Sequence, residues 1–284
     1  MTNIIQQVES KVKNIIKDYK LFSKKEKILI AYSGGKDSTV ILYILKKLGY
    51  NVEALTINAF IGNYSKKNLE NAVKFCKEHN IKLHNVSFRD EFGYSLCYLR
   101  NLIHSKGHKI KSCTICGVLR RYLINKYSKK LGANKIILGH NLDDEAQSVM
   151  MNFFRGNLEI CSRLGPITGL VKSKSFVTRV KPLYFITEKE ITKYSKKMKF
   201  PVVYTECPCS SDSYRRSVKV LLNELEKDNT NIKQNIIQNF IKILPKLKKQ
   251  FKTNKEINLC KYCKEPSKSD ICKTCQLVSL IVKK

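Results

Sequence analysis

Short apolar runs alternate with segments of helical periodicity along the first half of the chain. The stretch 27–48 has the pattern of a strand, a loop and a helix, and further apolar runs predict strands over 52–57, 82–88 and 135–138. Helical spacing predicts helices over 67–79, 117–131 and 142–154, whereas 90–104 fits either a helix or an irregular segment. Because such alternation is typical of parallel sheets, we expect an α/β fold in which helices sandwich a parallel sheet.

The flanking segments follow other patterns. Residues 1–24 have apolar positions at helical spacing, and beyond residue 155 glycines and prolines mark loops. There the pattern predicts a strand over 180–186 and helices over 187–198, 213–227 and 231–250. We therefore expect an N-terminal helix (1–24), a main domain (25–210), a helical extension (211–255) and a small cysteine-rich unit (256–284).

The charge of the chain changes this picture by indicating a partner. It has 54 Lys and Arg against 23 Asp and Glu, a net charge of +31 over 284 residues. A general bias toward lysine would inflate this number without explaining the scarcity of acids, so we expect contact with a polyanion such as nucleic acid. The sequence has neither a long apolar run nor a signal-like N-terminus, so we expect a cytoplasmic protein without a membrane partner.

The run Ser-Gly-Gly-Lys-Asp-Ser at residues 33–38 lies between the first predicted strand and the first predicted helix of the main domain. A glycine-containing turn before a helix binds anions, because helix-terminal amides are unpaired and the glycines allow close approach. The spacing is shorter than the Gly-x4-Gly-Lys of the Walker A motif. We expect a phosphate site of another kind here.

The tail contains two Cys-x-x-Cys pairs, Cys260 with Cys263 and Cys272 with Cys275. This spacing is typical of a tetrahedral zinc site with four thiolates. Such a site is closed to substrate, so the expected zinc is structural and supplies most of the folding energy of the tail. Residues 242–284 contain 12 Lys and three acids, which suits contacts with phosphates.

Two further groups carry candidate chemistry. Cys113 and Cys116 come just before a predicted helix, and alone this pair fits a redox pair, half of a zinc site or cluster ligands, with Cys207-Pro208-Cys209 as the available second half. Gly139 and the acids Asp143 and Asp144 follow a predicted strand, where adjacent carboxylates suit Mg²⁺ or simply stabilise a helix start. The other cysteines, Cys76, Cys97 and Cys161, we expect to be small buried side chains.

Five motifs in this order give the chain a resemblance to a known family. They are Ser-Gly-Gly-Lys-Asp-Ser at 33–38, Cys-Thr-Ile-Cys-Gly at 113–117, Gly-His-Asn-Leu-Asp-Asp-Glu-Ala-Gln at 139–147, Cys-Pro at 207–208 and the four-cysteine tail. The set resembles the tRNA 2-thiouridine synthetases of the PP-loop (N-type ATP pyrophosphatase) superfamily, in the branch found in archaea, some bacteria and the eukaryotic cytosol. The resemblance implies that the main domain, from residue 25, is Rossmann-like and catalytic.

The resemblance also implies roles for individual residues. An oxygen-sensitive iron–sulfur cluster, 4Fe–4S by this resemblance, would bind Cys113, Cys116 and Cys207, which leaves one iron open for sulfur. ATP would bind Ser33, Gly34, Gly35, Lys36, Asp37 and Ser38, together with Gly139. Asp144, with Asp143 beside it, would act near the uridine or Mg²⁺, and Arg120 near phosphates or RNA.

The implied reaction is ATP-dependent: a tRNA uridine is adenylated at its C2 oxygen, and sulfur then displaces AMP to give 2-thiouridine. The sulfur would come from a ubiquitin-like thiocarboxylate carrier or free sulfide. We favour the thymine-loop 5-methyluridine over the anticodon wobble uridine, and relatives are often homodimers. The alternatives are a tRNA 2-thiocytidine synthetase, against which the tail argues, and a non-catalytic RNA-binding zinc protein, against which the intact loop and cysteines argue.

Two features depart from the family pattern. Members often have an N-terminal zinc finger, but residues 1–26 contain no cysteine, so we do not expect that module here. Cys209 is an extra thiol beside the expected cluster ligand Cys207, and we take it as a bystander that could substitute as a ligand.

Overall fold

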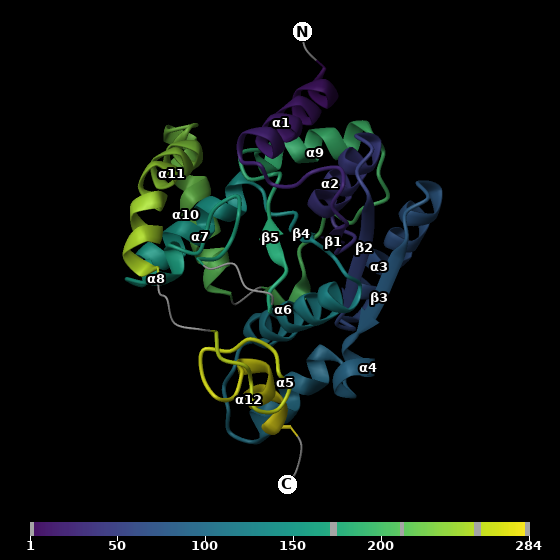
Figure 1. The fold of residues 1–284 in the computed structure, drawn as a ribbon, viewed down its shortest axis with the longest axis vertical. Coiled ribbons are helices and arrows are strands. Elements are labelled where there is room, and N and C mark those ends of the chain that lie inside the picture. Colours follow the sequence, from purple (N-terminus) through teal and green to yellow (C-terminus); the bar gives the residue numbers. More distant parts are fainter. Residues whose placement is uncertain (1–2, 171–174, 211–212, 253–256, 282–284) are drawn as a thin grey trace.

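The computed structural model describes residues 3–170, 175–210, 213–252 and 257–281. Five parallel strands form one sheet in the order β3-β2-β1-β4-β5 (Figure 1). They are β1 (Ile28–Ala31), β2 (Val52–Asn58), β3 (Leu83–Ser87), β4 (Lys135–Ile137) and β5 (Thr178–Val180). The expectation of an α/β fold with a parallel sheet is confirmed.

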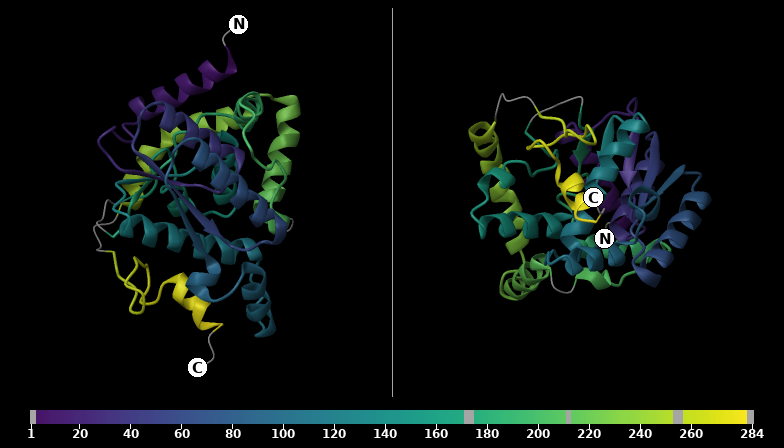
Figure 2. Two further views of the ribbon diagram at one scale, coloured as in Figure 1. Left: turned by 90° about the vertical axis from the view of Figure 1, so that its right-hand side faces the viewer. Right: turned by 90° about the horizontal axis from the view of Figure 1, so that it is seen from below.

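Helices cover both faces of the sheet because alternate residues of each strand point to opposite sides. On one side Ile28 and Ile30 of β1 belong to an apolar core with α1 (Ile4–Asp18), α2 (Lys36–Lys47), α3 (Gly62–Glu78) and α9 (Glu188–Lys197). On the other side Leu29 packs in a second core with α4 (Phe88–Phe92), α5 (Leu96–Ser105) and α6 (Ser112–Lys130). Figure 2 shows the sheet between these two layers.

A group of helices beyond β4 forms a third apolar cluster. It contains α7 (Leu142–Phe153), α8 (Leu158–Cys161), α10 (Tyr214–Asp228) and α11 (Ile232–Phe251), which contribute Val149, Cys161, Leu222 and Phe240. The apolar positions of α10 and α11 repeat at helical spacing, so each helix buries one face against α7 and leaves the other in water. These helices lie beside the sheet rather than over it (Figure 1).

The cysteine-rich unit packs against α6 through its short helix α12 (Lys273–Ser279). Leu277 enters the core beneath α6, and Glu265 accepts a hydrogen bond from Asn125 at 2.7 Å and pairs with Lys129. Figure 1 places this unit next to α5 and α6, at the end of the molecule opposite α1.

Two sequence predictions about elements are wrong. The helix expected over 117–131 begins at Ser112, so the first cysteine pair lies inside it and not before it. The strand expected over 180–186 ends at Val180, and hydrogen bonds from Tyr184 to Lys181 and from Ile186 to Leu183 form turns there instead. Pro182 has no N–H for a strand ladder, which explains why the strand ends.

Helix length and apolar character also bear on a membrane location. Among the residues that the structure describes, no helix is both long and apolar enough to cross a bilayer.

Candidate active site

The loop after β1 brings its backbone close to α3. Gly34 has φ +77°, and a Cβ there would lie 2.4 Å from the Asn68 carbonyl oxygen, so only glycine fits. Helix α2 begins directly after Gly35, which as N-cap has no side chain to bond the first amides. Those amides stay available to an anion, as the sequence predicted.

Lys36 and Asp37 form the charged part of this loop. Lys36 Nζ lies 3.2 Å from Asp37 and 2.9 Å from Glu188 at the start of α9. Burial alone would lower the pKa of Lys36, but these two carboxylates outweigh it and raise the pKa above its ordinary value. The ammonium group is therefore fully charged at neutral pH, as a phosphate ligand must be.

The turn after β4 meets this loop directly. A Cβ on Gly139 would lie 3.0 Å from the Ser38 backbone nitrogen, so the missing side chain allows the two turns to touch. Asn141 caps α7 and donates a hydrogen bond of 2.8 Å to Asp37. Burial is the main cause of a raised pKa at Asp37, and the nearby Asp144 raises it further. Asp37 and Asp144 both accept hydrogen bonds from Asn141, and carboxylates brought together in this way suit Mg²⁺.

The two adjacent aspartates of α7 have different surroundings. Asp144 completes the capping box with Asn141, and its side chain, one-third exposed, lies 3.4 Å from Arg215 of α10. Asp143 is buried and accepts hydrogen bonds from Lys233 Nζ at 2.8 Å and the Glu188 amide at 2.7 Å. Both oxygens of Asp143 are therefore engaged in holding α9 and α11 to α7.

The cysteines of the main domain meet where α6 begins. Cys113 Sγ donates a hydrogen bond of 3.2 Å to the Cys209 carbonyl in the short turn η1 (Pro208–Ser210), and α6 contacts η1. Burial raises the pKa of the Cys209 thiol to about 11, with Cys207, Cys97 and Cys113 as further causes. Cys97 is exposed and belongs to this group, contrary to the expectation that it is buried.

Arg120 and Tyr64 connect the cysteines to the nucleotide loop. Arg120 Nε lies 3.2 Å from Cys116 Sγ, one helical turn away on α6. Burial is the main cause of a raised pKa at Tyr64, with Cys207 raising it further and Arg120 and Lys36 lowering it. Tyr64, Arg120 and Ser33 also line one small cavity. The structure therefore brings the predicted phosphate loop, Arg120 and the cysteine pair to one edge of the sheet.

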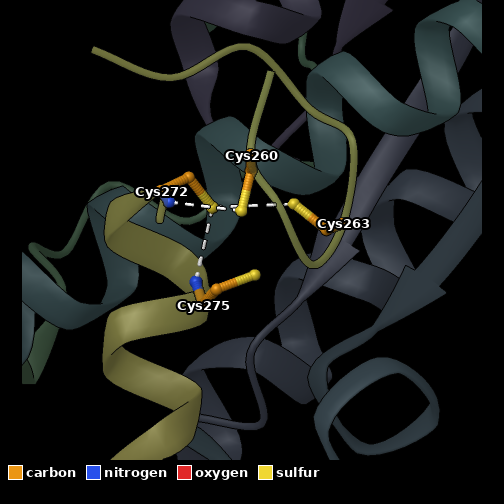
Figure 3. Close-up of side chains that lie close together, drawn as sticks. All are labelled: Cys260, Cys263, Cys272 and Cys275. Atoms are coloured by element: carbon orange, nitrogen blue, oxygen red, sulfur yellow. Dashed lines mark hydrogen bonds between the residues drawn. The ribbon is translucent and has the colours of Figure 1, made fainter. Parts of the chain in front are cut away.

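The four tail cysteines form a separate centre on the far side of α6. Their sulfur atoms all lie within 4.8 Å of one another and point toward a common centre (Figure 3). Burial would raise the pKa of Cys260, but backbone N–H groups of Cys263, Cys272 and Tyr262 bring it down to about 6. Four thiols at this separation fit a tetrahedral zinc ion.

Three contacts of the site were missed by sequence reasoning. Lys36 pairs with Glu188, Asp37 with Asn141, and Asp144 with Arg215. In each pair the two residues lie far apart along the chain. Asn141 sits inside a recognised motif, so its cap position was a readable signal. Glu188 and Arg215 carried none, because only the folded topology brings α9 and α10 to this edge.

The fold and the site together define a class. The PP-loop domain family matches residues 4–225 of the chain, which covers the sheet, the nucleotide loop and the cysteine pair. The protein is a PP-loop protein.

Relatives of known name narrow the class. The chain is 39% identical to the tRNA-5-methyluridine(54) 2-sulfurtransferase of Pyrococcus horikoshii over 96% of this chain and 84% of the relative. It is 33% identical to the cytoplasmic tRNA 2-thiolation protein 1 of Aspergillus niger, over 98% and 81%. The solved structure of the U34-tRNA thiolase NcsA from Methanococcus maripaludis, with its 4Fe–4S cluster, matches with a TM-score of 0.81 and 30% identity, over 97% and 87%. The chain belongs to the tRNA 2-thiolation branch of the PP-loop family.

Proposed function

We propose that this protein is an ATP-dependent tRNA sulfurtransferase that converts a uridine to 2-thiouridine. The observation that supports this most strongly is that Arg120 lines one small cavity with Ser33 of the nucleotide loop and also lies 3.2 Å from Cys116 Sγ. ATP activation of a carbonyl oxygen and delivery of sulfur must happen at the same atom, so both sets of residues have to face one space.

The nucleotide loop would hold the triphosphate. The free amides at the start of α2 and the Lys36 ammonium offer positive charge to phosphate oxygens, and Gly34 and Gly139 allow close approach. Asp37 and Asp144 would hold Mg²⁺ between them and the phosphates. When ATP binds, Lys36 would exchange its contact with Glu188 for phosphate contacts, because both compete for the same ammonium protons.

Arg120 is suited to stabilise the adenylated uridine. It lies on α6 between Cys116 and the small cavity lined by Ser33, and its guanidinium carries a permanent positive charge. A charge fixed at that place stabilises the negative charge that develops on the leaving phosphate. Asp143 is left with a structural role, because its oxygens already have partners.

Cys113, Cys116 and Cys207 would bind the iron–sulfur cluster. Three thiols are a suitable ligand set for such a cluster. Cys113 and Cys116 lie about one turn apart on α6, and Cys207 directly precedes η1, which contacts that helix. When bound, the cluster supplies an iron with an open position for a sulfur atom. Cys116 and Cys207 are half-buried against the apolar core beneath α6, whereas Cys113 is exposed.

The substrate position and the sulfur source are finer parts of the proposal. We favour the thymine-loop 5-methyluridine, the position in the name of the Pyrococcus relative, over the wobble uridine, U34, in the name of the Methanococcus thiolase. The donor would be a ubiquitin-like thiocarboxylate carrier or free sulfide, and the enzyme would work in the cytoplasm, with a homodimer as the assembly to test.

Nucleoside mass spectrometry of fragmented tRNA tests the function and the position together. Anaerobic protein incubated with unmodified tRNA, ATP and sulfide is expected to form a 2-thio-pyrimidine in the thymine loop. Sulfur in a cytidine would instead support a 2-thiocytidine synthetase, and no thiolation in any nucleotide would leave only an RNA-binding protein.

A further inference from the structure

A large cavity opens beside the cysteines and is not explained by ATP. It encloses about 1050 Å³ between α3, α5, the segment before α6 and η1. Its lining includes Tyr64, Cys97, Arg100, His104, Lys109 and Cys209. Cavities of ~300–1000 Å³ hold ligands of drug size, so this one has room for more than one nucleoside.

The lining of this cavity is basic. Arg100, Lys109 and Lys111 contribute cationic side chains, and His104 bonds the Ile110 carbonyl at 2.9 Å and so holds the segment before α6. Among the described residues that line the cavity, none is an Asp or Glu. Positive charge without carboxylates favours a ligand with several negative charges.

The cavity adjoins both parts of the proposed active site. Tyr64 lines it and also lines the small cavity that Ser33 and Arg120 share. Cys209 lines it and directly contacts Cys113 through its carbonyl. Tyr64 therefore borders both the large cavity and the small cavity beside the nucleotide loop.

An aromatic pair lies at the start of α5, the helix that carries Arg100. Tyr94 and Tyr98 stack with ring centroids 4.9 Å apart, and both are exposed. Tyr98 follows Cys97 on α5, which also carries Arg100 into the cavity. Exposed aromatic faces beside cations are the usual platform for unstacked bases of single-stranded RNA.

Resting on the proposed function, we propose that this cavity binds the single-stranded RNA segment that carries the target uridine. Arg100 and Lys109 contact phosphates on either side of that nucleotide, and Tyr98 stacks on a neighbouring base. The base of the target nucleotide reaches past Tyr64 toward the loop and the cysteines. The competing occupant is the C-terminal segment of a protein sulfur donor. Such a segment would not use an exposed aromatic pair together with several cations.

The native Cys97 thiol offers a direct test, because it is exposed and lines the cavity. Anaerobic full-length protein is treated with limiting N-ethylmaleimide, with and without tRNA, and the labelled peptides are quantified by mass spectrometry. We expect tRNA to slow labelling of Cys97 in proportion to the bound fraction. A reporter cysteine at Lys13→Cys on α1, at the opposite end of the molecule, should label equally in both samples (Figure 1).

Charge variants give a second, independent readout. Arg100→Ala and Lys109→Ala should each weaken tRNA binding roughly fivefold and lower the slope of log affinity against log salt by about 1, whereas Lys13→Ala should change neither. ATP binding should be unaffected in all three variants.

The outcomes separate this proposal from the function. If wild-type protein binds and thiolates tRNA while Cys97 stays unprotected, the cavity proposal is overturned and the function stands. It is also overturned if Arg100→Ala keeps full tRNA affinity but responds less to the sulfur donor, since the cavity then serves the donor. If the protein neither binds nor thiolates tRNA, the proposed function itself fails.

Discussion

Asp143 and Asp144 are neighbours in sequence, yet their contacts indicate different roles. Asp143 pairs with Lys233, whose side chain is only 6% exposed, whereas Asp144 caps α7 together with Asn141 and lies 3.4 Å from Arg215. From the sequence both looked equivalent, because a pair of acids after a strand suits metal binding and helix capping alike. The difference comes from α11, which lies about 90 residues away and supplies Lys233.

We predict that Asp143→Ala mainly destabilises the protein. The variant removes one of the two carboxylate partners of the buried Lys233, which keeps Glu226, and also takes the acceptor from the Glu188 amide. Loss of such buried hydrogen-bond partners costs about 1–3 kcal/mol in the free energy of unfolding. Urea denaturation measures the change, with Asp144→Ala as the matched control that should unfold nearly like wild type but lose thiolation. A stable, inactive Asp143→Ala protein would contradict the structural role.

We also predict that Cys207 and Cys209 differ as cluster ligands. Anaerobically purified Cys207→Ser should lose the broad visible absorbance of an iron–sulfur protein, because a ligand is missing. Cys209→Ser should keep this absorbance, because we assign Cys209 to the lining of the large cavity and not to the cluster ligands. Loss of colour and iron in Cys209→Ser would show instead that this thiol binds the cluster.

At the scale of elements, periodicity predicted most strands and helices but not where α6 begins. Its N-cap is Lys111, which provides no capping side chain, so the usual start signal is missing. The buried residues Ile115, Leu119 and Leu123 repeat every fourth position and would have extended the helix back over the cysteines. The tail is the opposite case, because cysteine spacing alone predicted that these four side chains come together, and the structure contains that four-cysteine cluster.

Removal of metal from the tail should loosen the second half of α6. The unit has little core of its own, so without zinc we expect it to unfold and its Glu265 contacts to Asn125 and Lys129 to be lost. Hydrogen exchange in Cys263→Ser should rise over α12 and residues 122–130, while ATP binding persists. Unchanged exchange in zinc-free protein would mean that packing of Leu277 is enough to hold the unit.

At the scale of the whole molecule, charge and topology act together. The net charge of +31 predicted a polyanionic partner but not its location, because lysines are spread along the entire chain. The location emerges from the fold, which gathers Arg100 and Lys109 around a cavity with the exposed tyrosines nearby. The same fold brings α9 and α10 to the nucleotide loop, and no local sequence pattern predicts that arrangement.

Binding of tRNA should therefore weaken steeply as salt rises. Each phosphate neutralised releases counterions, and we expect a log–log slope steeper than about −3 for an interface with several such contacts. Filter binding at increasing potassium chloride concentrations measures it. A flat response would mean that the positive charge of this surface does not take part in binding.

The central claim is that one site couples ATP cleavage to sulfur transfer, and the ratio of products tests it most directly. Anaerobic protein with tRNA, ATP and sulfide should release one AMP for each 2-thiouridine formed, and Lys36→Ala should lower both rates together by about 100-fold or more. Thiolation that proceeds without ATP, or that survives intact in Lys36→Ala, would contradict the account.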